Sequence, residues 1–153
     1  MTFQSSTPYE PSHPKALAIY CSDGRFTQPV EDLLHSLGHA RLDTCTLPGG
    51  PGLLNHLSAS YADADAMTRS ASFLIHGHGI TEVVLLAHHG CGYYKHKRPI
   101  DSPEQIEMRQ LDDLRHAAKA VKKIDDKLIV RLYFARPHAG HVKFEPVVLP
   151  PRL

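Results

Sequence analysis

The sequence alternates short apolar segments with longer amphipathic ones, and this alternation limits the possible fold more than any other feature. Strands that alternate with helices imply a mostly parallel sheet, with helices on both faces and right-handed crossovers. The last two apolar segments are separated only by a short turn, which predicts an antiparallel hairpin. The predicted fold class is therefore α/β: a mostly parallel sheet of about four strands plus a C-terminal antiparallel strand. The predicted strands are residues 15–23, 40–47, 81–87, 127–135 and 141–149.

Three amphipathic segments carry helix signals. Pro29 is expected to start a helix that Gly38 ends. A longer helix is expected from about Asp63. Ser102 and Gln105 have the spacing of a capping box, in which each side chain bonds the other residue's backbone N–H. These helices supply the crossovers that a parallel sheet needs.

Two connecting segments are harder to assign from their pattern. Leu53 and Leu57 follow a glycine-rich turn at the spacing of a helical face, so a further short helix is expected to begin there. Residues 95–98, KHKR, are expected to form a solvent-exposed loop, because the run is too short to indicate a nucleic-acid-binding surface.

Length and composition indicate one globular domain. Residues 1–14 are polar and contain three prolines, which predicts an extended N-terminal arm, whereas residues 15–153 are expected to form a single α/β domain. A net charge of +1 favours neither a nucleic acid nor an anionic membrane as partner. No apolar run reaches the roughly 20 residues of a membrane span, and the first residues lack the layout of a secretory signal. Three cysteines do not suit a disulfide framework, so a reducing cytoplasm is expected.

Cysteine and histidine follow two of the predicted strands. Cys21 ends the first strand, and His88 and Cys91 follow the third. Ligands of parallel sheets bind at the carboxyl ends of the strands, so these side chains meet if the two strands are neighbours. His76 and His78 precede the third strand and are therefore expected at the opposite edge.

Two thiolates and one imidazole are the donor set that zinc prefers, and three protein ligands leave the open position of a catalytic zinc site. One alternative is a structural site in which Cys45 is the fourth ligand. Cys45 lies inside the second predicted strand, so we interpret it as a small buried apolar residue. A second alternative replaces His88 by His89, but two residues between ligands favour His88.

Asp23 and Arg25 lie two residues apart, directly after Cys21. A guanidinium at this distance can form a charge-assisted hydrogen bond with the carboxylate and keep it ionised. Such a carboxylate beside the metal can orient an attacking water. The alternative is an ordinary surface ion pair.

Cys21-x-Asp23-x-Arg25 followed by His88-x-x-Cys91 resembles the signature of the beta-class carbonic anhydrases. The resemblance implies one zinc ion per chain on the two cysteines and the histidine, with Asp23 and Arg25 as a catalytic dyad. It implies reversible hydration of CO2 to bicarbonate by zinc-bound hydroxide, in a homodimer or a multiple of one. In some members of that family the aspartate is a fourth zinc ligand at rest.

The resemblance covers roughly residues 15–148 but fails at one segment. Where that family usually has Arg-Asn-Ala-Gly, this chain has Leu47, Pro48 and two glycines. Gly49 and Gly50 are expected to bind substrate through backbone N–H groups. The altered segment leaves two other functions open, which are hydrolysis of carbonyl sulfide or carbon disulfide and zinc binding without catalysis. A proton leaving the site is expected to pass through His89 or His138.

Overall fold

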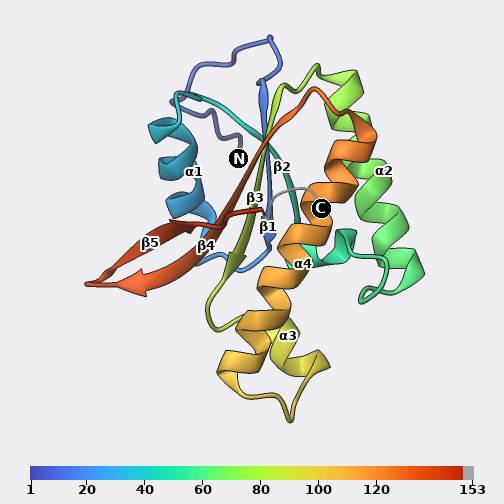
Figure 1. The fold of residues 1–153 in the computed structure, drawn as a ribbon. Coiled ribbons are helices and arrows are strands. Elements are labelled where there is room, and N and C mark those ends of the chain that lie inside the picture. The colour runs from blue at the N-terminus through green and yellow to red at the C-terminus, as the bar shows by residue number, and fades with distance from the viewer. Residues whose placement is uncertain (150–153) are drawn as a thin grey trace.

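A computed structural model describes residues 1–149, and the last four residues of the predicted 15–153 domain lie outside the described part. Its strands form a single sheet in the order β2-β1-β3-β4-β5 (Figure 1). The first four strands in this order are parallel, and β5 pairs antiparallel with β4. The predicted fold class is confirmed. The strands are β1 (Ala16–Cys21), β2 (Asp43–Leu47), β3 (Glu82–His88), β4 (Ile129–His138) and β5 (His141–Pro146).

Helices cover both faces of the sheet, with α1 on one face and α2 and α4 on the other (Figure 1). A 3-10 turn, η1, and the short helix α3 lie in loops that leave the carboxyl ends of β2 and β3. Within residues 1–149 no helix is both long and apolar enough to span a membrane. The helical elements are α1 (Thr27–Ser36), η1 (Gly50–Leu54), α2 (Tyr61–Gly77), α3 (Gly92–Lys97) and α4 (Pro103–Ile124).

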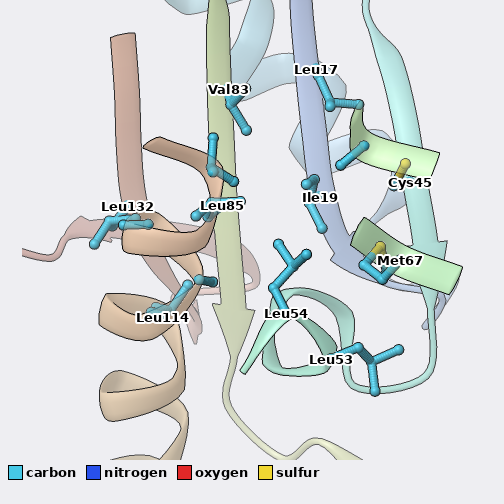
Figure 2. Close-up of a cluster of buried hydrophobic side chains, with 14 of the residues drawn as sticks. Leu17, Ile19, Cys45, Leu53, Leu54, Met67, Val83, Leu85, Leu114 and Leu132 are labelled. Atoms are coloured by element: carbon cyan, nitrogen blue, oxygen red, sulfur yellow. The ribbon is translucent and has the colours of Figure 1, made fainter. Parts of the chain in front are cut away.

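The central strands β1 and β3 are buried along their whole length, which explains why their sequences are almost entirely apolar. Because successive side chains of a strand point to opposite faces, Leu17 and Ile19 contact the layer of α2 and α4, whereas Ala18 and Tyr20 contact α1. Figure 2 shows the larger cluster, in which Leu54 of η1 packs beside β1 and β3. The core therefore also anchors the turn that follows β2.

The capping box of α4 is present as predicted. The hydroxyl of Ser102 accepts a hydrogen bond from the Gln105 backbone N–H at 3.2 Å, and the Gln105 side chain accepts one from the Ser102 N–H at 2.8 Å. We expect Ser102→Ala to lower the free energy of unfolding by about 1 kcal/mol, because a helix donor loses its partner. Urea denaturation measures the change.

A matched control for this prediction is Ser70→Ala. Ser70 lies inside α2, where its hydroxyl donates to the Ala66 carbonyl group. Alanine favours a helix interior more than serine does, so no loss of stability is expected. Equal stability of the Ser102→Ala protein and the parent would contradict the importance of the capping box.

Three expectations about local structure were wrong. The first helix begins at Thr27 rather than Pro29, with Phe26 as its N-cap residue. The helix expected from Leu53 is only the turn η1, and Leu57 beyond it is exposed. Residues 95–98 are not a loop, because α3 extends to Lys97, although their side chains are exposed as expected. An element this short shows no recognisable apolar period in the sequence.

Residues 1–14 contain no helix or strand. The end of this segment contacts the domain at two points: the Arg41 guanidinium donates to the Ser12 carbonyl oxygen at 2.7 Å, and the ring of His13 stacks on His78 at 3.8 Å between centroids. The division into an arm and one domain stays a prediction.

Candidate metal centre

The sheet order brings the three predicted ligands together. β1 and β3 are neighbouring parallel strands, and Cys21 and His88 are their last residues. Cys91 follows after a short turn, as the N-cap residue of α3. One ligand atom from each of these residues lies within 4.8 Å of the other two, and all three residues are buried. We call this group the Cys-His-Cys cluster.

The two sulfur atoms have a spacing that suits a shared cation. Cys21 Sγ lies 4.0 Å from Cys91 Sγ. Two thiolates bound to one zinc ion at tetrahedral angles, each at about 2.3 Å, would be about 3.8 Å apart. The hydrogen bond between the thiols lowers the pKa of Cys21 and raises that of Cys91, because the pair shares one proton. A divalent cation would replace that proton and balance both thiolates.

The imidazole of His88 has one nitrogen bonded and one free. Nδ1 lies 2.8 Å from the carbonyl oxygen of His89, and a carbonyl can only accept a hydrogen bond, so Nδ1 carries the proton. Nε2 is buried and has no hydrogen-bond partner, one of two such side-chain atoms among the described residues. A buried polar atom without a partner costs free energy, and a metal ion would satisfy this one. The residues therefore fit zinc.

Neighbouring side chains hold His88 in place. The ring of Phe26 lies 4.3 Å from the His88 ring, centroid to centroid. The amide of Gln110, on α4, donates to the His88 carbonyl oxygen at 2.9 Å. His88 is thus contacted from both faces of the sheet, its ring by Phe26 and its backbone by Gln110.

The alternative ligands lie elsewhere. Cys45 is buried in the core beside Met67, as Figure 2 shows, and it does not belong to the Cys-His-Cys cluster. The side chain of His89 is exposed. His78 pairs with Asp43 at 2.6 Å, at the start of β2 and thus at the opposite edge of the sheet, as predicted. His138 ends β4 and faces His141 at the tip of the hairpin.

Asp23 is held by Arg25 through several hydrogen bonds. The guanidinium donates to both carboxylate oxygens, with Nη2 2.6 Å from Oδ2 and Nε 3.0 Å from Oδ1, and the Arg25 backbone N–H adds a bond to Oδ1 at 3.0 Å. These bonds from Arg25 lower the pKa of Asp23 to about 2. The carboxylate is therefore ionised at neutral pH. In the described structure it bonds to Arg25 and is not part of the Cys-His-Cys cluster.

The glycine turn lies against Cys21 because Leu47, at the end of β2, pairs with Cys21 across the sheet. Gly49 and Gly50 have φ angles of +90° and +54°. The Gly49 backbone N–H faces the Cys21 sulfur and helps to lower the pKa of that thiol. A Cβ atom at Gly50 would lie 2.6 Å from the Cys21 nitrogen, so only glycine lets the turn approach so closely.

Sequence reasoning missed two buried polar residues of α4, one of which bonds the His88 backbone. Gln110 and Asp113 are buried on the helix face that also carries Ile106 and Leu114. A signal was present: polar residues at core-facing positions of an amphipathic helix need partners, which function often supplies. The sequence could not name those partners.

Comparison with known protein sequences and families gives one match. A family model described as "Putative carbonic anhydrase" matches residues 12–145. No curated protein sequence matches the chain.

Solved structures of low sequence identity share the fold. The beta-carbonic anhydrase CafA of Aspergillus fumigatus is 16% identical with a TM-score of 0.57, over 91% of this chain and 78% of that one. The beta-carbonic anhydrase TvaCA1 of Trichomonas vaginalis is 17% identical with a TM-score of 0.56, over 92% and 87%. A chain of one of two tetrameric beta-carbonic anhydrases from Sordaria macrospora is 15% identical with a TM-score of 0.56, over 87% of this chain and 81% of that one. Because the family model spans most of the sequence, the chain belongs to the family described as putative carbonic anhydrases, and its fold is that of the beta-carbonic anhydrases of known structure.

Proposed function

We propose that this protein is a zinc-dependent carbonic anhydrase that reversibly hydrates CO2 to bicarbonate. The observation that carries the proposal is the Cys-His-Cys cluster, with two sulfur atoms 4.0 Å apart and an unpartnered buried nitrogen, His88 Nε2. When bound, zinc lowers the pKa of water enough to supply hydroxide at neutral pH.

The number of ligands supports catalysis. In the proposal, Cys21, His88 and Cys91 bind one zinc ion per chain. Within residues 1–149 the cluster contains no fourth cysteine, histidine or carboxylate. Structural zinc sites are closed by four protein ligands, whereas catalytic sites keep one position open.

Asp23 and Arg25 are proposed to act on the reacting water. Arg25 keeps the Asp23 carboxylate ionised, so that it can accept a hydrogen bond and orient the oxygen that attacks CO2. Gly49 and Gly50 are proposed to bind the substrate beside Cys21. Since the Gly49 N–H helps to lower the pKa of the Cys21 thiol, its first role is to support that ligand.

Two measurements on one preparation test the proposed function: zinc content per chain, and stopped-flow CO2 hydration from about pH 6 to about pH 9. We expect about one zinc ion per chain and an activity that rises with pH. A zinc-loaded protein that hydrates CO2 no faster than buffer would refute the proposal. Faster turnover of carbonyl sulfide than of CO2 would assign the second substrate class instead.

Asp23→Asn should keep zinc but slow hydration by about 10- to 100-fold, the range for residues that act on a metal site from outside its ligand set. The amide is nearly isosteric but uncharged, so it loses the ion pair with Arg25 and presents a donor to the reacting water. Stopped-flow rates and zinc content measure the two effects.

Asp65→Asn is the matched control for this change, because Asp65 pairs with Arg69 on the exposed surface of α2. Its hydration rate should equal that of the parent. An Asp23→Asn protein as fast as this control would remove Asp23 from the mechanism.

We also propose a cytoplasmic homodimer or a higher multiple of one. The three cysteines are free thiols, two of them in the Cys-His-Cys cluster, which supports a reducing compartment. The enzymes of Sordaria macrospora that share the fold are tetrameric, which supports a homo-oligomer. Light scattering after gel filtration gives the number of chains, and a monomer at micromolar concentration would contradict the proposal.

A further inference from the structure

A buried carboxylate on α4 joins three separate parts of the chain. Asp113 is 6% exposed. Its Oδ1 accepts hydrogen bonds from the Asn55 amide at 2.7 Å and the Ser58 hydroxyl at 2.9 Å, and its Oδ2 accepts one from the Tyr94 hydroxyl at 2.5 Å. The last distance is in the range for a hydroxyl bonded to an ionised carboxylate, about 2.5–2.7 Å. Asp113 thus ties α4 to α3 and to the loop after η1.

Of the two segments that Asp113 joins, one begins at Cys91 and the other follows the turn that lies against Cys21. Tyr94 belongs to α3, whose N-cap residue is Cys91, and its ring packs in one buried cluster with both Cys21 and Cys91. Asn55 directly follows η1, whose turn lies against Cys21. A displacement of either segment would therefore change the distance between the two sulfur atoms.

The contact between the two segments is also close. A Cβ atom on Gly52 would lie 2.1 Å from the Tyr94 hydroxyl oxygen, so the backbone of η1 touches that hydroxyl directly. The hydroxyl in turn is aimed at Asp113. Asn55 accepts a further hydrogen bond from the Leu57 backbone N–H at 3.1 Å, which orders the loop itself.

A buried carboxylate is an unfavourable choice if a residue is needed only to pack these segments together. Burying it costs free energy unless hydrogen bonds satisfy it, and apolar side chains of similar volume often stabilise a core more. What a carboxylate offers is fixed geometry: it accepts from several donors at defined angles.

We infer that Asp113 is a positioning residue for the metal centre. Through Tyr94 and Asn55 it holds α3 against the η1 turn, so that Cys21 and Cys91 have the spacing of metal ligands before any ion binds. This inference rests on the proposed zinc site and concerns how that site is built. Asp113 acts through Tyr94 and Asn55, not on the metal or the substrate.

Asp113→Asn tests the inference, because it keeps the shape but replaces one acceptor by a donor. We expect the zinc dissociation constant to rise about tenfold, the lower end of the range for residues that orient metal ligands. Competition with a chromophoric chelator measures it without any assay of activity. The visible spectrum of the cobalt(II)-loaded variant should also shift, since ligand geometry changes.

Glu82→Gln is the matched control. Glu82 is another buried carboxylate, bonded by Arg131 at 2.6 Å and His39 at 3.1 Å, but it begins β3 and so lies at the opposite edge of the sheet. Both variants should lower the melting temperature, and only Asp113→Asn should weaken zinc binding. Equal dissociation constants for Asp113→Asn and the parent would overturn the inference.

Tyr94→Phe is the second variant, in case Asp113→Asn does not fold. It removes one hydrogen bond and keeps the ring against the cysteines. A weaker zinc affinity supports the inference, and an unchanged affinity in this variant overturns it. The two proposals can fail separately: a parent that binds no zinc refutes the proposed function and this inference together, whereas tight zinc binding in parent and variants alike refutes only the positioning role.

Discussion

Cys91→Ser should be purified almost free of zinc, with less than about one tenth of an ion per chain, and without CO2 hydratase activity. A serine hydroxyl is a far weaker zinc ligand than a thiolate, because it stays protonated at neutral pH. Cys91 is also buried, and within residues 1–149 the cluster holds no other cysteine, histidine or carboxylate that could replace it. Metal analysis after gel filtration, with parent protein in parallel, measures the loss.

Cys45→Ser is the matched control for this prediction. Cys45 is the third buried thiol, but it pairs with Ile19 in the sheet and belongs to the core cluster that contains Met67, not to the Cys-His-Cys cluster. We expect full zinc content and a modest loss of stability from the buried hydroxyl. Zinc lost from Cys45→Ser and retained in Cys91→Ser would show that the ligand set is wrong.

Gly50→Ala should lower the free energy of unfolding by about 3 kcal/mol and weaken zinc binding at the same time. About 1 kcal/mol comes from a left-handed φ of +54° in a residue with a side chain, and the rest from steric overlap. The new Cβ atom would lie 2.6 Å from the Cys21 nitrogen and 2.7 Å from the Tyr20 carbonyl carbon. Both atoms are backbone, so the turn must move away from Cys21. Urea denaturation and chelator competition measure the two effects.

Gly140→Ala separates the two causes. Gly140 has a φ of +77°, but a Cβ atom there would have no neighbour within 4 Å. We expect a loss of about 1 kcal/mol and unchanged zinc affinity. If both variants lost the same stability and kept their zinc affinity, the close approach of the turn to Cys21 would not matter for the metal centre.

The convergence of the three predicted ligands could be predicted from the sequence because a general rule of parallel sheets applies to them. Cys21 and His88 each end an apolar strand, and the carboxyl ends of parallel strands share one edge. The same rule correctly placed His78 at the opposite edge. Cys45 was interpreted correctly as a core residue for a related reason, since it lies inside a strand.

The supporting residues could not be found in this way. Asp113 and Tyr94 are 19 positions apart, and neither follows a strand. The sequence showed a polar residue on an apolar helix face but not which donors would reach it. The start of α1 and the extent of α3 were also missed, because single turns have no period to recognise.

By itself the sequence determined the α/β class, the identity of the converging side chains and the family, since periodicity, strand ends and motif spacing are properties of short stretches of chain. Only the tertiary structure decided the order of the strands, the 4.0 Å between the two sulfur atoms and the free Nε2 of His88. The reason is physical. Distances between residues far apart in sequence depend on how whole elements pack, and that packing is a collective result of the core.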